Sequence, residues 1–96
     1  MALSLAMRVQ ASPDVMIRDV AGESVILDLK TERYLGLDEA GSRFWHAVTT
    51  AASLRAACEQ VLAEYDVEPA RLEADLVEFV GQLLDQGLVV EAAAGA

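Results

Sequence analysis

The residue types that most often perform chemistry in enzymes are scarce in this chain. It has one histidine, His46, and one cysteine, Cys58. Nucleophilic catalysis needs a nucleophile, a base and a group that orients the base, and a zinc site needs about four nitrogen or sulfur ligands. Cys58 falls inside an apolar helical stripe, where cysteine packs as a small hydrophobe, whereas His46 falls off such a stripe and is expected to face solvent. We therefore predict no catalytic residue, no metal and no cofactor.

The acidic residues give the chain a formal net charge of −9. Residues 1–55 carry six bases against seven acids, whereas residues 56–96 carry one base, Arg71, against nine acids. A nucleic-acid binder needs Lys and Arg to displace the counterions of phosphates. The charge therefore argues against DNA and RNA, and it favours a basic peptide or protein as partner. Glu73, Asp75 and Glu78 read as the solvated face of a helix, with charge contacts to a partner as the alternative.

The secondary-structure elements that must position any binding site fall into two groups along the chain, strands first and helices second. Segments 15–20, 24–29 and 33–37 are rich in β-branched and apolar residues and are separated by short turns, which predicts three strands in an antiparallel meander. In the second strand, Val25, Leu27 and Leu29 share one face.

Helical spacing then takes over. Asp38 and Ser53 are suitable N-caps, and apolar residues recur at helical intervals, so we predict helices over 39–49 and 54–65. A third helix begins at Pro69 and ends at Gly87, with a buried stripe of Leu72, Leu76, Phe79, Val80 and Leu83. Strands followed by helices predict an α+β fold with the helices on one side of the sheet.

Because no catalytic cluster is found, binding through the backbone is the function that the pattern favours. If the third strand lies at the border of the sheet, an extended peptide can add a further strand to it. Gly36 has no side chain to shield that border. A β-bulge or a close contact with a helix is an equally good explanation for Gly36, and the pattern alone leaves both open.

One run of the sequence, residues 26–45, resembles the signature of the PqqD family. The pattern is an apolar strand, a turn containing threonine, an Arg-Tyr pair, a Leu-Asp pair, a glycine and an apolar residue before tryptophan. In this chain the features are Ile26 to Leu29, Thr31, Arg33-Tyr34, Leu37-Asp38, Gly41 and Phe44-Trp45. Segments 64–67, 73–76 and 87–88 also match, so the resemblance extends over residues 13–90.

The resemblance implies a winged-helix-like domain that acts as a recognition element in a pathway for a ribosomally made, modified peptide. PqqD-like proteins hold the leader of the precursor peptide as an added strand between the third strand and the third helix. They deliver it to a modifying enzyme such as a leader protease, a cyclase or a radical SAM enzyme. Carried over, the resemblance implies a peptide-binding site made of Arg33, Tyr34, Leu35, Gly36 and Leu37 on the strand and Arg71, Leu72, Asp75, Leu76 and Phe79 on the helix.

Three positions depart from the family pattern. Glu32 replaces a frequent turn glycine, Leu35 replaces a frequent second aromatic residue, and residues 49–52 replace an Asp-Gly pair. The change at Glu32 concerns turn geometry, and the change at Leu35 concerns the shape of the peptide pocket. The resemblance does not separate pyrroloquinoline quinone synthesis from a lasso-peptide pathway or another class, although the generic form of the third strand favours a lasso-type or orphan gene cluster.

Two other functions are compatible with the same elements. A winged-helix DNA-binding regulator would place the third helix in the major groove, but residues 69–87 carry Arg71 against four acids. A structural subunit would bind its enzyme whether or not a leader is present.

The expected domain organisation is a flexible N-terminal arm over residues 1–12, a PqqD-like domain over 13–91 and a frayed tail over 92–96.

The first residues lack the basic start of a signal peptide, and no apolar run approaches the ~18 residues of a membrane span. We therefore expect a cytoplasmic protein that binds neither membrane nor nucleic acid. An open strand border also makes a homodimer plausible.

Overall fold

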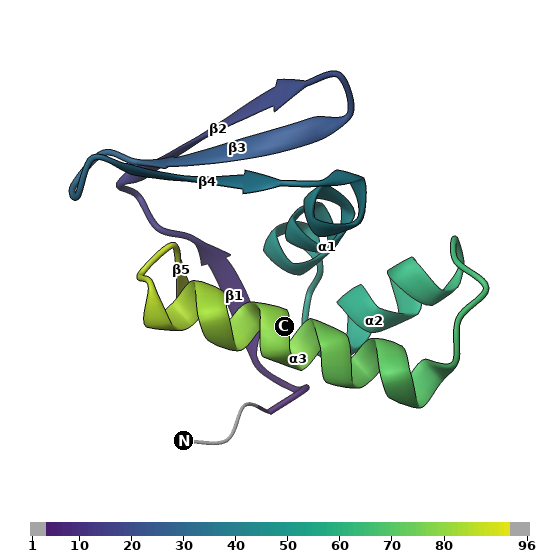
Figure 1. The fold of residues 1–96 in the computed structure, drawn as a ribbon. Coiled ribbons are helices and arrows are strands. Elements are labelled where there is room, and N and C mark those ends of the chain that lie inside the picture. The colour runs from purple at the N-terminus through teal and green to yellow at the C-terminus, as the bar shows by residue number, and fades with distance from the viewer. Residues whose placement is uncertain (1–3, 93–96) are drawn as a thin grey trace.

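In the computed structural model, which describes residues 4–92, the chain forms a three-stranded antiparallel sheet, three helices and a separate pair of short strands. The elements are β1 (Arg8–Ala11), β2 (Val15–Val20), β3 (Glu23–Asp28), β4 (Arg33–Leu37), α1 (Glu39–Thr50), α2 (Leu54–Leu62), α3 (Pro69–Asp85) and β5 (Val89–Ala92). Figure 1 shows the β2–β3–β4 sheet on one side of the molecule and the helices beneath it. The predicted α+β class, with three strands followed by three helices, is confirmed.

Tight turns join the strands of this sheet. Ala21 and Gly22 both have positive φ, 54° and 85°, which is the geometry of a two-residue type I′ hairpin turn. Between β3 and β4, the Asp28 carboxylate accepts hydrogen bonds from the backbone N–H groups of Lys30 at 3.0 Å and Thr31 at 3.3 Å. These bonds hold the chain in the bend that returns it to the sheet.

Side-chain caps and a glycine set the ends of the helices. The Asp38 carboxylate accepts from the Gly41 N–H at 2.7 Å at the start of α1. The Ser53 hydroxyl accepts from the Ala56 N–H at 3.1 Å at the start of α2. Gly87, with φ of 72°, ends α3 in the left-handed conformation that glycine adopts at low cost. Both predicted N-caps and the predicted stop are therefore confirmed.

The core lies between the inner face of the sheet and the apolar stripes of the helices. Ile26 at the centre of β3 has no exposed surface, and it belongs to the same buried cluster as Val48 of α1, Leu54 of α2 and Leu76 of α3. Cys58 of α2 is also a member, at 8% exposure. The predicted stripe of α3 is buried at Leu72, Leu76, Val80 and Leu83, while Phe79 is half-buried at its flank.

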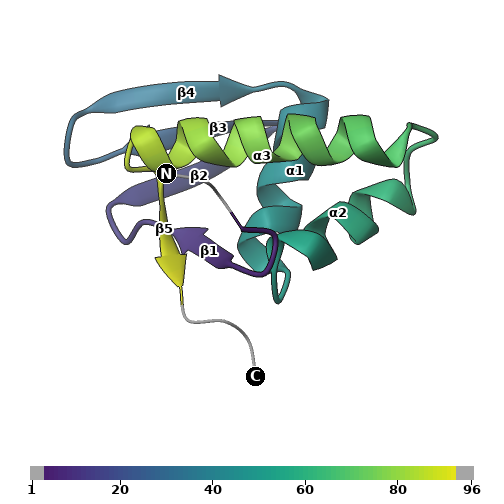
Figure 2. The same ribbon diagram turned by 90° about the horizontal axis from the view of Figure 1, so that it is seen from below.

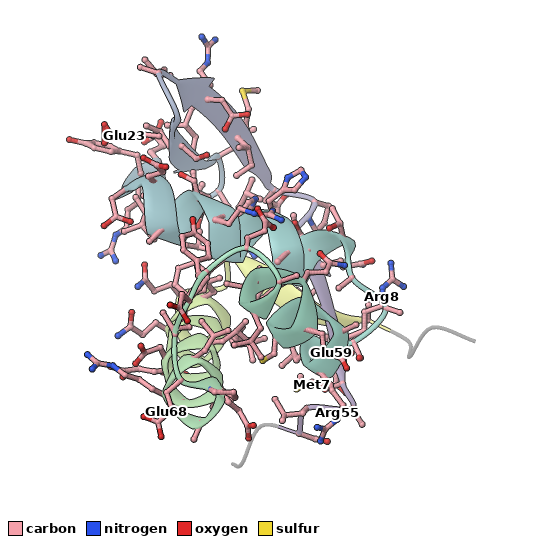
Figure 3. The ribbon with its side chains drawn as sticks, turned by 90° about the vertical axis from the view of Figure 1, so that its right-hand side faces the viewer. Met7, Arg8, Glu23, Arg55, Glu59 and Glu68 are labelled. Carbon is pink, nitrogen blue, oxygen red and sulfur yellow. The ribbon has the colours of Figure 1, made fainter. Side chains whose placement is uncertain are left out.

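The N-terminal segment is part of the fold, whereas a flexible arm was expected. β1 pairs antiparallel with β5, and Val9 within it is fully buried. The carbonyls of Leu5 and Met7 accept hydrogen bonds from the N–H groups of Arg55 and Leu54, and Figure 3 shows Met7 beside Arg55. These donors lie in the first turn of α2, where a helix provides no internal partners for them.

The C-terminal boundary and the end of α2 also differ from the expectation. The expected tail over residues 92–96 starts inside β5, because Ala92 pairs with Arg8; residues 93–96, like residues 1–3, lie outside the described part of the chain. α2 ends at Leu62 and not at residue 65. The reason is that the N–H groups of Glu64 and Tyr65 both turn to the carbonyl of Val61, which tightens the last turn.

No helix among residues 4–92 is long and apolar enough to cross a membrane.

Candidate functional site

The outer border of β4 is open. The strand order of the larger sheet is β2–β3–β4, so within the described residues β4 pairs only with β3. β2 has an open border as well, and a hollow shared with α1 lies beside that strand. α3 runs past β4 in the opposite direction in both views, Figure 1 and Figure 2, and it supplies a second wall.

The backbone groups of Tyr34 and Gly36 face this open border. In an antiparallel sheet, alternate residues of a strand bond to alternate neighbours. The N–H of Leu29 donates to the carbonyl of Asp14 at 2.8 Å, in register with the β2–β3 pairing. Odd-numbered residues of β3 therefore bond to β2, and even-numbered ones bond to β4. The β4 partners of those even-numbered residues are Arg33, Leu35 and Leu37. The N–H and C=O groups of Tyr34 and Gly36 are thus left for a further strand.

Two hollows lie along α3, one against β4 and one against α1, and we term them together the β4–α3 groove. The first, of about 420 Å³, lies between the start of β4 and the end of α3. It is lined by Ile26, Asp28, Thr31, Arg33, Tyr34, Leu35, Asp85, Gln86 and Leu88. The second, of about 240 Å³, lies between the start of α1 and the middle of α3. It is lined by Ala40, Gly41, Phe44, Asp75, Glu78, Phe79 and Gln82. The first hollow therefore lies against the start of β4, and the second lies further along α3, against α1.

An apolar pocket of about 160 Å³ continues the second hollow toward the start of α3. It is lined by Ala40, Phe44, Val61, Tyr65, Val67, Arg71, Leu72 and Asp75. Ala40, Phe44 and Asp75 line both spaces, so a side chain that enters one can reach the other.

The ten residues predicted for the site divide by exposure. Arg33, Tyr34, Gly36, Arg71 and Asp75 are exposed, Leu35 and Phe79 are half-buried, and Leu37, Leu72 and Leu76 are buried. Leu76 has no exposed surface at all, so it supports the wall of the groove from the core side and offers nothing to a peptide. Phe79 does reach the groove, where its ring meets the ring of Phe44 edge-on, with centroids 5.7 Å apart.

The structure brings to the groove further residues that are not among the ten predicted for the site. On α3 they are Glu78, Gln82, Asp85 and Gln86, which together with Asp75 recur at intervals of three or four residues beside the apolar stripe. This helical period was a usable signal, because residues that flank a buried stripe form the nearest exposed surface. α1 adds Ala40, Gly41 and Phe44, and nothing in the sequence indicates their approach to α3.

The α3 side of the groove is acidic. Asp75, Glu78 and Asp85 are exposed, and the ion pair between Arg43 and Glu64 lies elsewhere. Asp28, at the β4 side, is nearly buried. Burial raises its pKa, but hydrogen bonds from Thr31 and from the Lys30 N–H, with the Lys30 charge, outweigh burial and lower the pKa below the usual value. Asp28 therefore stays ionised and keeps the turn closed.

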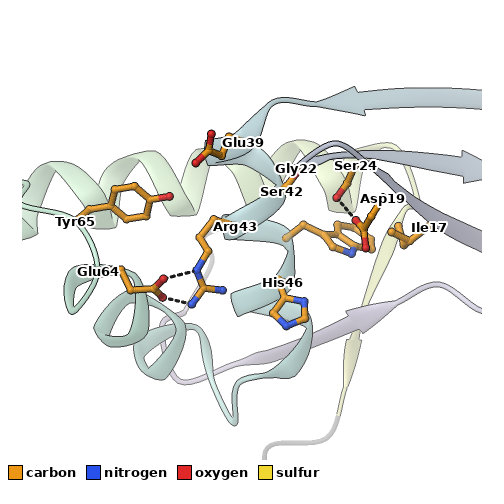
Figure 4. A pocket seen from close by; sticks show the side chains of 11 residues that line it. Ile17, Asp19, Gly22, Ser24, Glu39, Ser42, Arg43, His46, Glu64 and Tyr65 are labelled. Carbon is orange, nitrogen blue, oxygen red and sulfur yellow. Dashed lines mark hydrogen bonds and ion pairs between the residues drawn. The ribbon is translucent and has the colours of Figure 1, made fainter.

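A larger hollow of about 570 Å³ lies on the other side of α1, as Figure 4 shows. Its polar groups are already paired. Arg43 forms an ion pair with Glu64, its Nε donating to Oε1 at 2.9 Å, and the hydrogen bond from Arg43 lowers the pKa of Glu64. The Ser24 hydroxyl donates to Asp19 at 2.6 Å. This hollow also lies between an open strand, β2, and a helix, α1, but these pairs occupy most of its charged groups, whereas Asp75, Glu78 and Asp85 beside the β4–α3 groove make no described ion pair, so we take the β4–α3 groove as the candidate peptide site.

His46 and Cys58 lie where the sequence predicted. His46 is exposed at the rim of the larger hollow, and Cys58 is buried in the core. Burial, and then the Glu73 charge, raise the pKa of the Cys58 thiol, which makes it a poor nucleophile at neutral pH. No group of three or more potential metal ligands gathers anywhere in residues 4–92.

Comparison with known proteins identifies the family of this chain. A family profile described as coenzyme PQQ synthesis protein D (PqqD) matches residues 23–89, which include β3, β4 and all three helices. A comparison with curated proteins finds no match.

Two solved structures share the fold. One, described as TbiB1 in complex with the TbiA(beta) leader peptide, has a TM-score of 0.78 and 30% sequence identity, and the match covers 88% of this chain and 98% of that one. The other, described as lasso peptide synthetase B1 complexed with the leader peptide, also has a TM-score of 0.78. Its sequence identity is 19%, and the match covers 86% of this chain and 98% of that one.

Proposed function

The chain belongs to the PqqD family, and from this premise we propose that it is a peptide-binding module without catalytic activity of its own. It captures the leader of a ribosomally made precursor peptide as an added strand on β4 and delivers the precursor to a modifying enzyme. The similarity to TbiB1, whose structure holds a leader peptide, supports the capture of a leader. Because such precursors are released from the ribosome in the cytoplasm, the module would act there.

The observation that carries this proposal is the open border of β4 opposite α3. Tyr34 and Gly36 present N–H and C=O groups that no other described residue of the sheet uses. A peptide strand can bond to both residues, and the bonds fix its position along β4 without reading its sequence.

Selection among peptides then falls to the side chains. Alternate residues of an added strand point to opposite faces, so every second residue of the leader points toward the helices and into the β4–α3 groove. The half-buried rings of Phe44 and Phe79 offer apolar contact there. The exposed carboxylates of Asp75 and Glu78 favour a basic residue beside it.

The direct test is to titrate the purified chain with the synthetic leader of the precursor encoded beside it. We expect a dissociation constant near 1 μM or below, about −8 kcal/mol or stronger, after the cost of ordering a flexible leader. Amide resonances of β4 and α3 should shift by NMR. A scrambled leader of the same composition is the control, and equal affinity for both peptides would contradict strand addition with side-chain selection.

A proline substitution tests the strand geometry. Gly36→Pro removes an N–H that only an added strand uses, so the protein should fold while leader affinity falls at least about tenfold, the effect of one lost backbone bond. Leu35→Pro removes an N–H bonded to β3 and should unfold the sheet. Asp19→Pro, at the open border of β2, is the matched control and should leave leader affinity unchanged. A folded Gly36→Pro variant with full affinity would place the leader elsewhere.

DNA binding is not supported by any feature of the structure. α3 carries one base against four acids, and its exposed side beside the groove is acidic, so it would repel the phosphates that a recognition helix must approach.

A further inference from the structure

The outer face of the β2–β3–β4 sheet is apolar and uncovered. All three helices lie on the inner side of this sheet, and Figure 1 shows no described element on the other side. The inner face carries Ile26, which is fully buried, and its cross-strand partners Ile17 and Leu35. The residues that alternate with these therefore point outward.

Cross-strand pairing arranges the outward residues in two rows. The first row is Met16, Leu27 and Tyr34, and the second is Arg18, Val25 and Gly36. Met16 is 44% exposed and Tyr34 is 77% exposed. Val20, at the outer end of β2, is 62% exposed. Proteins that act alone rarely expose apolar side chains in one contiguous patch, so such a patch marks an interaction surface.

Arg18 gives this face a specific charge requirement. It lies on the outer face beside Val25, and no ion pair or hydrogen bond of its side chain is found among residues 4–92. A partner that covers the face must therefore bring a carboxylate to Arg18 as well as apolar side chains. A second copy of this chain would bring another Arg18 to the same region, which disfavours self-association through this face.

The face is continuous with the edge that takes the leader. Tyr34 and Gly36 direct their backbone groups to the open border and belong to the two outward rows. A strand added to β4 would extend both rows by one residue each, because its outward side chains lie in the same plane. Whatever covers the outer face therefore touches the leader too.

We propose that the outer face of β2–β3–β4 is the docking surface for the modifying enzyme and that the bound leader strand completes it. This inference rests on the proposed function. It explains how the enzyme can distinguish a module that holds a precursor from an empty one. The enzyme meets a four-stranded surface when the leader is bound and a three-stranded surface when it is absent.

The test begins with three variants of the full chain in which an apolar residue is replaced by glutamate. Met16→Glu and Val20→Glu change the patch on β2, at the opposite border from the leader, and Val90→Glu changes a similarly exposed residue of β5. The probes are the synthetic leader and the purified modifying enzyme encoded with the precursor. We expect the enzyme to bind the leader-loaded chain at least tenfold more tightly than the free chain.

In the Met16→Glu and Val20→Glu variants, the affinity of the enzyme for the loaded chain should fall at least tenfold, while leader affinity stays within twofold of the wild type. Val90→Glu should change neither. Arg18→Glu should weaken enzyme binding more than Arg18→Gln does, because the new carboxylate would repel the carboxylate of the partner.

The possible failures are distinguishable. If the wild-type chain does not bind the leader, the proposed function fails. If it binds the leader but the enzyme does not bind, or binds all variants equally, the docking surface alone is wrong. If light scattering gives the mass of a dimer that Met16→Glu converts to a monomer, with enzyme affinity unchanged, the face joins two copies of this chain and the proposal is overturned.

Discussion

Glu32 occupies a backbone conformation that suits glycine. Its φ is 59°, and the family pattern often has glycine in this turn. The left-handed conformation costs a residue with a side chain about 1–2 kcal/mol, whereas glycine loses about 0.5–1 kcal/mol more chain entropy on folding. Glu32→Gly should therefore stabilise the protein by about 0.5–1 kcal/mol, which raises the Tm by about 2–8 °C.

Thermal unfolding followed by circular dichroism measures this change. Lys30→Gly is the control, because Lys30 lies in the same turn without positive φ, and it should lower the Tm. A lower Tm in both variants would mean that the conformation of Glu32 carries no strain.

Phe79 and Leu76, one turn apart on α3, should respond differently to a negative charge. Phe79 lines the groove, so Phe79→Asp should leave the protein folded and weaken leader binding at least about tenfold, as the loss of a buried aromatic anchor does. Leu76→Asp would bury a carboxylate without a partner and should prevent folding. Val77→Asp, which is half-buried but lines no described pocket, is the control and should retain leader affinity. Leader titration measures the affinity of each variant, and circular dichroism shows whether the variant is folded.

At the scale of elements, two carboxylates hold neighbouring segments together. Asp28 closes the turn between β3 and β4, and Glu64 joins the end of α2 to Arg43 of α1. Both have pKa values lowered in the folded protein. A lowered pKa adds stability that is fully present above the ordinary carboxyl pKa, about 4, and is lost as the pH falls through the folded value.

Urea unfolding should therefore show a loss of stability between about pH 5 and pH 2. Glu64→Gln and Asp28→Asn should each make the dependence on pH shallower in that range and should lower stability at pH 7. Glu91→Gln serves as a control, because its carboxylate makes no described ion pair. Identical profiles for all four proteins would show that these contacts do not persist in solution.

At the scale of the whole molecule, the N-terminal strand is part of the folding unit. Val9 is fully buried and belongs to the main core. Val9→Ala should cost about 1.5–3 kcal/mol, the range for burying one aliphatic side chain. Deletion of residues 1–12 should cost more, because it also leaves β5 unpaired and the first turn of α2 without acceptors.

Equilibrium urea unfolding of both proteins tests this prediction, with Gln10→Ala, an exposed residue of the same strand, as the control. A deletion variant as stable as the full chain would restore the boundary expected from sequence, in which the domain begins at residue 13.

The sequence was sufficient for features that depend on neighbouring residues. Strand alternation, helical stripes, the caps at Asp38 and Ser53 and the stop at Gly87 all follow from contacts within a few residues, so the element order and fold class could be predicted. The segments that form the candidate site were identified by family resemblance.

Contacts between distant segments required the tertiary structure. The pairing of β1 with β5 joins opposite ends of the chain, and no local pattern encodes it. The approach of Phe44 to Phe79 and the openness of the β4 border likewise depend on how α1 and α3 pack around the sheet. The pattern of a strand shows that it has two faces and two borders, but only packing decides which of them the rest of the chain leaves free.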